Sequence, residues 1–347
     1  MRIAFVVNGI DTERAGYTTT HLALAALRMG HDPWYVGMED FTHTEQGVIR
    51  LHATAAPGRG YRSAKTYLAA VRGEDAARDL IDATEFDVVF LRNDPAEDRE
   101  ERPWAQNVGI LFGQVIARTG VLVVNDPNGL AQAMNKMYLE AFPEEVRPRT
   151  LTTRNAEEIR RFVKDLRGSA VIKPLQGSGG ESVFLLKDEN ANLNQMIEAV
   201  SRYGYLIVQE YLPAAAEKDT RLFLMNGDPI VVDGVHAALH RVASKGDMRS
   251  NITAGGKPKR AKVTDLHLRI AEAVRPRLID DGMFLVGLDI AGEKIMEINV
   301  FSPGGLHCIS DLEELDFCAP VIEALERKVG YRERYGAVFP NERIATL

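Results

Sequence analysis

The chain has 347 residues, of which 45% are hydrophobic and 26% charged, and its formal net charge is −7 at pH 7. This length is enough for two or three domains that bury ordinary hydrophobic cores. The mildly acidic balance, with basic residues scattered along the chain, argues against nucleic acid or an anionic membrane surface as the principal partner and favours small molecules.

The first ten residues, MRIAFVVNGI, are apolar over too short a stretch for a signal peptide, and no run approaches the length of a membrane span. We therefore expect a cytoplasmic protein. Cys308 and Cys318 lack the spacing of a zinc site, so two reduced thiols are expected rather than a disulfide or a metal site.

Residues 1–127 predict an α/β domain. The apolar strand RIAFVV is followed by TTTHLALAALRMGH, which has helical spacing, a polar start and a glycine near its end. Further strands at 87–92 and 120–126, with a helical segment between them, indicate a parallel sheet covered by helices. No GxGxxG follows the first strand, so a scaffold without a bound dinucleotide is expected.

After residue 127 the pattern changes to short helices and antiparallel hairpins. Helices are expected in AQAMNKMYLEAF and NAEEIRRFVKDL, a hairpin in SAVIKPLQGSGGESVFLLK, and a strand in YLIVQEYLP. Two strands around a Gly-Asp turn, a glycine-rich basic loop, the helix in TDLHLRIAEAVRPRLIDDG and a final hairpin follow. His236 and His240 have the spacing of a helical metal site, but they lie in sequence typical of strand and loop, so no metal is assigned to them.

The final hairpin, LDIAGEKIMEINVFSPGG, carries Asp289, Glu297 and Asn299 in otherwise apolar strands. Alternation places Ile295, Glu297 and Asn299 on one face of the second strand. A three-residue turn at 292–294 would set Asp289 opposite Glu297, whereas an even turn would separate them. Clustered carboxylates repel unless one is protonated or a cation lies between them, and these oxygens suit Mg²⁺. A Mg²⁺ site is predicted, with a solvated strand face as the alternative.

The loop in KPLQGSGGESV is rich in glycine. Its glycines let backbone N–H groups approach phosphate oxygens, although it is not a Walker A loop and a flexible hairpin turn is the alternative. Lys173, just before it in the apolar run AVIKPL, would be costly to bury without an anionic partner such as a nucleotide phosphate.

Several further motifs occur together in a fixed order: VVNDPNGL, MNKMYL, VIKPLQGSGGESVF, VQEYLPA, AGG, VGLDI and EINVFSP. With these motifs the sequence resembles the bacterial glutathione synthetases of the ATP-grasp superfamily over nearly the whole chain. The resemblance implies an α/β N-terminal domain plus an ATP-grasp fold, in which two α+β subdomains grip the nucleotide. The expected units are the N-terminal domain at 1–127, a lid subdomain at 128–212, a large subdomain with the metal and substrate site at 213–335, and a C-terminal tail at 336–347. The family resemblance also implies a homo-oligomer.

Carried over position by position, the resemblance assigns nucleotide contacts, metal ligands and substrate contacts. The expected ATP-binding residues are Lys136 and Lys173 on the phosphates, Gly177, Ser178, Gly179 and Gly180 in the lid, and Gln209, Glu210, Tyr211 and Leu212 near the adenine. The expected ligands of Mg²⁺, with Mn²⁺ as the alternative ion, are Asp289, Glu297 and Asn299, so that metal-bound ATP would neutralise the acidic hairpin. The expected catalytic residues are Arg221, Arg249 and Asn251, with ordinary surface basicity as the alternative for the arginines. The expected substrate contacts are Arg92, Arg221, Ser302, Pro303, Gly304 and Gly305.

The family makes an amide from a carboxylate and an amine by way of an acylphosphate, and its founding substrates are γ-glutamylcysteine and glycine. This sequence departs from the family where the donor is held: Gly304-Gly305-Leu306 is interposed after SP, Ser310 stands in the place of an arginine, and RSN replaces RGN. LRNDPAED also lacks the basic residue that usually follows Arg92. His307 is either a new contact or an incidental loop histidine.

The sequence therefore indicates glutathione synthetase itself or a relative with a different donor or acceptor. A nucleotide-binding protein without catalysis is the alternative of another class. A carboxylase or phosphotransferase built on the same fold is the third possibility.

Overall fold

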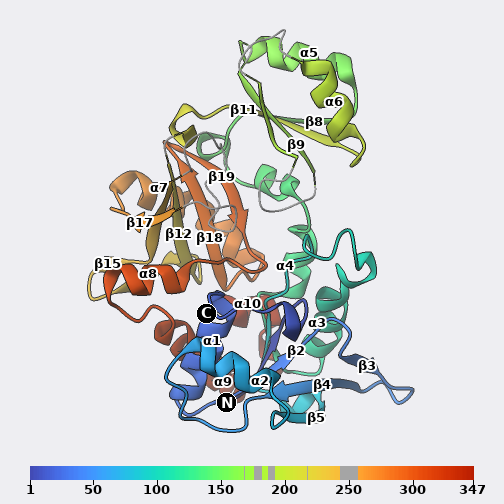
Figure 1. Ribbon diagram of the computed structural model, residues 1–347, viewed down its shortest axis with the longest axis vertical. Coiled ribbons are helices and arrows are strands. Elements are labelled where there is room, and N and C mark those ends of the chain that lie inside the picture. The colour runs from blue at the N-terminus through green and yellow to red at the C-terminus, as the bar shows by residue number, and fades with distance from the viewer. Residues whose placement is uncertain (168, 176–181, 187–191, 217, 243–256) are drawn as a thin grey trace.

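The computed structural model describes residues 1–347 except 168, 176–181, 187–191, 217 and 243–256. Three sheets follow one another along the long axis of the molecule (Figure 1). The N-terminal sheet lies at one end, a four-stranded sheet lies at the other, and a six-stranded sheet lies between them. Within the described ranges, no helix combines the length and the apolar content that crossing a membrane requires.

The N-terminal sheet is mixed. Its strands are β1 (Arg2–Val6), β2 (Asp32–Val36), β3 (Phe41–His43), β4 (Ile49–Ala55), β5 (Ala77–Asp82), β6 (Val88–Leu91) and β7 (Leu122–Val124). β1, β6 and β7 are parallel neighbours, as the sequence predicts, and β2, which the sequence did not predict, pairs parallel with β1. β4 pairs antiparallel with β2, β3 and β5, an extension that the sequence analysis missed.

Helices from both ends of the chain cover the N-terminal sheet. They are α1 (Thr18–Arg28), α2 (Ala64–Arg72), α3 (Val108–Arg118), α4 (Pro127–Gln132), α9 (Ala319–Tyr335) and α10 (Asn341–Thr346). Leu22 of α1 and Val321 of α9 share one buried core with Ile3 and Phe5 of β1. Asn341 of α10 donates to the Val123 carbonyl at 2.8 Å and accepts from its amide at 3.0 Å. The predicted tail therefore contains a helix that is fastened to β7.

The six-stranded sheet is antiparallel throughout. It consists of β12 (Asp219–Met225), β13 (Asp228–Pro229), β16 (Ala238–Val242), β17 (Lys257–Arg260), β18 (Leu285–Ala291) and β19 (Lys294–Asn299), in the order β17-β16-β12-β18-β19, with β13 beside β12. α7 (Asp265–Asp280) packs on it through Ile270, Val274 and Leu278. The short strands β14 (Val231–Val232) and β15 (Val235–His236) form a separate pair. His236 and His240 thus lie on β15 and β16, not on a helix.

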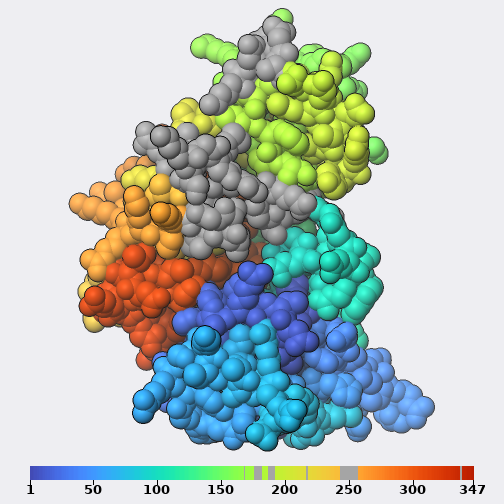
Figure 2. All heavy atoms as spheres, in the orientation of Figure 1, coloured from blue at the N-terminus to red at the C-terminus, as the bar shows by residue number. Residues whose placement is uncertain are grey.

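The four-stranded sheet forms a lobe with its own core. It consists of β8 (Thr150–Thr153), β9 (Ala170–Pro174), β10 (Phe184–Leu186) and β11 (Leu206–Glu210), in the antiparallel order β10-β9-β11-β8. The amphipathic helices α5 (Ala156–Asp165) and α6 (Leu193–Ser201) cover it, and the core they share contains only residues of this lobe. Figure 2 shows this lobe at the far end of the molecule from the N-terminal domain.

The N-terminal domain and the six-stranded sheet are joined by close polar contacts. Asn125, after β7, accepts from the Leu285 amide at 2.8 Å and donates to the carbonyls of Leu285 and Val300. At the start of α4, a Cβ added to Gly129 would lie 1.9 Å from the Asp281 carbonyl oxygen, so this position requires glycine. These contacts fix the β18–β19 hairpin against the carboxyl end of β7.

Candidate active site

The β18–β19 hairpin places Asp289 directly opposite Glu297, as the sequence predicts, but by a different route. The turn contains two residues, 292 and 293, rather than three. A β-bulge supplies the missing residue, because Ile290 pairs with Ile295 while Asp289 pairs with Glu297. A bulge adds one residue to one strand and shifts the facing pattern beyond it.

The same bulge makes the expected orientation of Ile295 wrong. Ile295 pairs with Ile290, and both are buried in the core beneath the sheet together with Leu288. Glu297 and Asn299 instead line a cavity on the opposite face. Simple alternation along β19 could not reveal this change of face, because the bulge lies between Ile295 and Glu297.

Asp289 is neutralised by arginines. Its side chain is 1% exposed, and Arg221 binds both of its oxygens, Nε to Oδ1 and Nη2 to Oδ2, at 2.7 Å each. Arg241 Nη2 lies 2.7 Å from Oδ2, and Asn299 Nδ2 donates to the same atom at 3.1 Å. Two guanidinium groups thus neutralise this carboxylate, and its expected neutralisation by metal-bound ATP stays a prediction.

Asp289 is one end of a longer network. Arg241 also binds both oxygens of Asp219, at 2.7 and 3.0 Å, and these three side chains are each at most 4% exposed. Burial acts to raise the pKa of Asp289, but Arg221 and Arg241 outweigh it and hold that pKa below its usual value. Asp289 is therefore ionised and serves to fix the two arginines.

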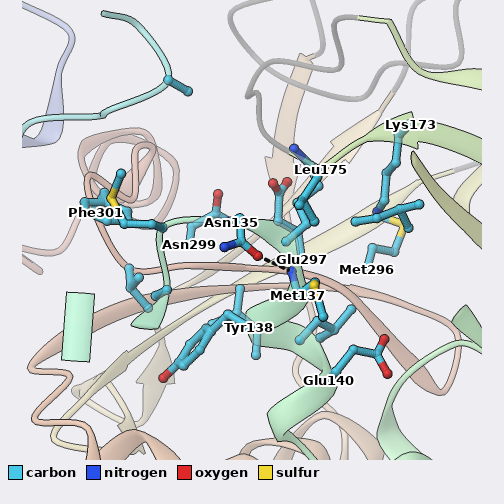
Figure 3. Close-up of a pocket in the computed structure, with 18 of the residues that line it drawn as sticks. Asn135, Met137, Tyr138, Glu140, Lys173, Leu175, Met296, Glu297, Asn299 and Phe301 are labelled. Atoms are coloured by element: carbon cyan, nitrogen blue, oxygen red, sulfur yellow. Dashed lines mark hydrogen bonds between the residues drawn. The ribbon is translucent and has the colours of Figure 1, made fainter. Parts of the chain in front are cut away.

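A cavity lies between β19 and the strands β9 and β11 of the four-stranded sheet, with Lys173, Glu297 and Asn299 in its wall (Figure 3). Lys173 Nζ donates to Gln209 Oε1 at 2.9 Å, and Gln209 Nε2 donates to Thr150 Oγ1 at 3.1 Å. The apolar part of the wall includes Met137, Leu139, Leu175, Ile207, Met296 and Ile298. The cavity thus combines an apolar wall with cations, a carboxylate and an amide.

Two partly buried lysines of this cavity have lowered pKa values. Burial lowers the pKa of Lys173 to about 8, partly offset by Glu297, while Lys136 lowers it further. Burial also lowers the pKa of Lys136, which begins η4 (Lys136–Ala141), and Glu297 again opposes the shift. A phosphate bound between them would favour the charged form of both ammonium groups, so both positions suit a nucleotide phosphate.

A second cavity of about 500 Å³ lies between the N-terminal domain and the six-stranded sheet. Its wall includes Arg92 and Arg221, both expected substrate contacts. The two cavities meet along a common border, since four residues line both of them: Asp94, Glu297, Asn299 and Ser302. A ligand in one cavity therefore faces a ligand in the other.

The segment after β19 shapes the second cavity through its backbone. Arg92 Nη2 donates to the Pro303 carbonyl at 3.2 Å, and Arg221 Nη1 donates to the Gly304 carbonyl at 3.0 Å. Gly305 precedes α8 (Leu306–Glu313) with a φ of +106°, a conformation that favours glycine. Ser302, Gly304 and Gly305 line the cavity, as expected for substrate contacts.

Other expected residues lie elsewhere. Gly177, Ser178, Gly179, Gly180, Arg249 and Asn251 lie outside the described residues. Of the adenine segment, Gln209 lines the first cavity, whereas Glu210, Tyr211 and Leu212 continue from β11 towards η6 (Pro213–Ala216) and are not part of its wall. Glu210 accepts a hydrogen bond from the Arg149 amide at 3.1 Å.

Ser310 points into its own helix rather than into the cavity. Its Oγ donates to the Leu306 carbonyl at 3.4 Å and accepts from the Phe317 amide at 3.3 Å. His307, in the first turn of α8, lines the second cavity and stacks on His21 with ring centroids 4.7 Å apart. Burial, followed by the neighbouring His21, lowers the pKa of His307 to about 4, so this ring is neutral at pH 7.

Sequence reasoning missed several charged residues of the second cavity, among them Arg241 and Glu13. Arg241 lies in the strand sequence ALHRV, where a basic residue among apolar ones is the same kind of signal that singled out Lys173. Glu13 lies in the polar loop DTERAG, which resembles any solvated turn. Only the fold reveals that its side chain is 7% exposed.

Comparison with known proteins agrees with this architecture. The chain matches the family model described as prokaryotic glutathione synthetase, N-terminal domain, over residues 1–131, and the model for the ATP-grasp domain of the same family over residues 135–314. It is 36% identical to the glutathione synthetase of Gloeobacter violaceus, covering 91% of this chain and 93% of the relative. It is 34% identical to that of Synechococcus elongatus, covering 95% and 99%.

Solved structures with the same fold are more distant in sequence. The D-cycloserine synthetase DcsG superposes with a TM-score of 0.63 at 15% identity, over 94% of this chain and 99% of the other. The ATP-grasp ligase PsnB, solved with a minimal precursor, Mg and ADP, gives a TM-score of 0.59 at 16% identity, over 94% and 98%. At these identities the likeness supports the ATP-grasp fold alone.

Proposed function

The chain belongs to the prokaryotic glutathione synthetase family, and on this premise we propose which substrates its two cavities bring together. It is an ATP-dependent, ADP-forming carbon–nitrogen ligase. The first cavity binds ATP, and the second binds a γ-glutamyl donor whose carboxylate is joined to an amine. γ-Glutamylcysteine and glycine are the leading substrates, which makes glutathione the leading product.

The residues of the first cavity fit a nucleotide with a divalent ion. Lys136 and Lys173 place two partly buried cations in its wall, which suits phosphate oxygens, and the apolar wall suits a base. Glu297 and Asn299 would hold the ion, Mg²⁺ with Mn²⁺ as the alternative, through their oxygens. Bound there, the ion would neutralise phosphate charge. Asp289, the third expected ligand, would join them from its place between Arg221 and Arg241.

The chain's own residues position the reactants. Lys136 and Lys173 hold the phosphates, and Asp289 holds Arg221 at the Gly304 carbonyl beside the donor. A carboxylate oxygen of the donor attacks the γ-phosphorus of ATP, and ADP leaves, which produces an acylphosphate. The amine then attacks the acyl carbon, phosphate leaves and the nitrogen loses a proton. No side-chain nucleophile is required, and alignment of this kind contributes about 7–11 kcal/mol.

The observation that carries this proposal is the border shared by the two cavities. Glu297, Asn299 and Ser302 line both, so the phosphate end of a nucleotide and the carboxylate of a donor would meet there. Catalysis by alignment and charge neutralisation needs this adjacency.

Incubation with Mg²⁺-ATP, γ-glutamyl dipeptides and a panel of amines, with products identified by mass spectrometry, tests the proposal. We expect ADP, phosphate and a new amide only when donor and amine are both present, and glutathione from γ-glutamylcysteine and glycine. The Lys173→Met variant, which lacks the proposed phosphate contact, is the negative control and should lose turnover. ADP formation that is independent of the donor, or no turnover with any γ-glutamyl donor, would contradict the proposal.

A related ligase with a different donor is the second candidate. Ser310 stands where the family has an arginine, and its hydroxyl is bonded within α8 and beyond its end, not directed at the cavity. His307 and Cys308 line that part of the wall instead. If γ-glutamylcysteine is a poor donor, the same panel names the better one.

Two further properties complete the proposal. We propose a homo-oligomer located in the cytoplasm, because the family resemblance implies the first and the sequence favours the second. Light scattering of the purified protein tests the assembly: a mass equal to that of one 38.4 kDa chain would contradict it.

A further inference from the structure

The second cavity contains a buried carboxylate that the proposed mechanism does not use. Glu13 follows η1 (Ile10–Thr12), and its side chain is 7% exposed and lines the cavity. Thr20 Oγ1 donates to its Oε2 at 3.3 Å. Arg72 fixes the loop from outside by donating to the backbone carbonyls of Ile10, Asp11 and Glu13. These hydrogen bonds hold the Glu13 side chain and its loop in a defined position in the cavity wall.

Arg92 lines the same cavity and is 2% exposed. Its Nε donates to Thr19 Oγ1 and its Nη2 donates to the Pro303 carbonyl, each at 3.2 Å, which uses two of its five N–H groups. In the part of the chain that the structure describes, no salt bridge joins Glu13 or Arg92 to another residue. The wall therefore holds one buried anion and one buried cation, each without an ion pair.

Burial shifts the pKa of both groups in the direction that favours the neutral form. Burial raises the pKa of Glu13 to about 7, with the Thr20 hydrogen bond and Arg92 opposing the shift, and burial lowers the pKa of Arg92 to about 10. Burial, then Asp94 and Asp98, also raises the pKa of Glu97, another residue of this wall. Arg14 lies over the ring of Tyr17 at 5.8 Å. Glu13 and Arg92 act on each other electrostatically, since each shifts the pKa of the other towards the charged form, but no salt bridge joins them. A closer partner of opposite charge would therefore stabilise the charged form of each group.

We propose that Glu13 binds the α-ammonium group of the donor while Arg92 binds its α-carboxylate, so that Glu13 selects donors with an intact amino-acid head. This inference rests on the proposed function. Glu13 and Arg92 lie away from the shared border, since neither lines the first cavity. The group that they bind is consequently the far end of the donor, whereas the reacting carboxylate and the acceptor amine meet at the border. Glu13 is a specificity-determining residue and takes no part in bond formation.

Two donor analogues separate the charges of the head. Glutarylcysteine keeps the carboxylate and lacks the ammonium, and 4-aminobutyrylcysteine keeps the ammonium and lacks the carboxylate. With the wild-type protein, we expect kcat/KM for γ-glutamylcysteine to exceed that for glutarylcysteine by about tenfold or more, because a buried charge is left unpaired by the analogue.

The Glu13→Gln variant has nearly the same shape and removes the charge. It should raise the KM for γ-glutamylcysteine about tenfold, abolish the preference over glutarylcysteine, and leave the KM values for ATP and for the acceptor unchanged. Asp11→Asn, two residues away and exposed, is the matched control and should behave as wild type. Equal use of both donors by the wild-type protein, or an effect of Glu13→Gln on the acceptor KM instead, would overturn the inference.

Failure of the proposed function would be recognised separately. If no γ-glutamyl donor supports ADP release, calorimetric titration of the protein with γ-glutamylcysteine and glutarylcysteine decides the inference without turnover. Binding about tenfold tighter for γ-glutamylcysteine, lost in Glu13→Gln, supports the assigned site. Equal affinity for the two ligands, or binding of neither, overturns it.

Discussion

Arg221 and Asp289 lie opposite each other on β12 and β18 and form a two-pronged salt bridge, with both N–O distances 2.7 Å. The remaining Nη1 of Arg221 donates to the Gly304 carbonyl in the wall of the second cavity. Asp289, which the sequence predicts to be a metal ligand, therefore also anchors an arginine. Buried pairs of this kind fix geometry, and they become costly when one partner is removed.

Asp289→Asn should destabilise the protein strongly. The variant leaves Arg221 and Arg241 buried without their shared anion, and breaking a buried pair in this way costs about 3–5 kcal/mol. Denaturant unfolding measures the change. The matched control is Asp228→Asn, since Asp228 pairs with Arg275 at 3.1 Å on the surface, where such pairs are worth about 0–1 kcal/mol. Similar losses in the two variants would show that the buried network is not a stabilising element.

Affinity for nucleotide should fall as the pH rises above about 8, because the pKa of Lys173 is about 8 in the free protein. A bound phosphate favours the ammonium form of Lys173 and raises its pKa, so nucleotide binding above pH 8 is accompanied by uptake of a proton. The nucleotide affinity therefore falls with rising pH, approaching a tenfold decrease per pH unit. ADP affinity measured by calorimetry between about pH 7.5 and 9.5 tests this. In the Lys173→Arg variant the side chain stays charged over this pH range, so the ADP affinity should depend less on pH. Parallel pH profiles for the variant and the wild-type protein would assign the dependence to another group.

Glu297→Gln should raise the Mg²⁺ concentration required for half-maximal activity by about tenfold or more, since a neutral amide is a weaker ligand for a hard cation. Titration calorimetry of Mn²⁺ into the ADP complex gives a readout that does not depend on turnover. Glu293→Gln, in the exposed turn of the same hairpin, is the control and should bind metal as wild type does. Unchanged metal affinity in Glu297→Gln would remove Glu297 from the site.

Gly305→Ala should cost about 1–2 kcal/mol of stability and raise the donor KM, because the residue at the start of α8 has a φ of +106°. The adjacent Gly304→Ala is a close control, since a Cβ there meets nothing within 4 Å. Thermal unfolding and donor KM, measured side by side, test the difference. If the two alanine variants behave alike, the backbone conformation of Gly305 does not shape the cavity.

The sequence predicted those features that depend on local pattern. The β9–β10 hairpin, α5, α7 and the parallel core of the N-terminal sheet follow from apolar spacing and turn residues, and each was confirmed. Lys173 stood out because a charge in a buried strand needs a partner. The opposition of Asp289 and Glu297 was also correct, although a bulge and not the turn produces it.

What the sequence could not predict depends on pairing between distant segments. Asp289 is neutralised by Arg221 and Arg241, which lie 68 and 48 positions earlier in the chain, and no local pattern announces that contact. Glu13 occurs in a polar loop, and its burial depends on the folding of that loop against Thr20 and Arg72 beside the cavity. For the same reason, the sequence did not predict that β4 pairs antiparallel with β2 and β5.

The central claim is that the donor carboxylate receives the γ-phosphoryl group of ATP at the border between the two cavities. Donor labelled with ¹⁸O in its reacting carboxylate tests this directly, with the released phosphate read by mass spectrometry. We predict that each turnover transfers one ¹⁸O atom to phosphate and leaves the other in the new amide. Phosphate that is formed at the same rate but contains no label from the donor would contradict the account.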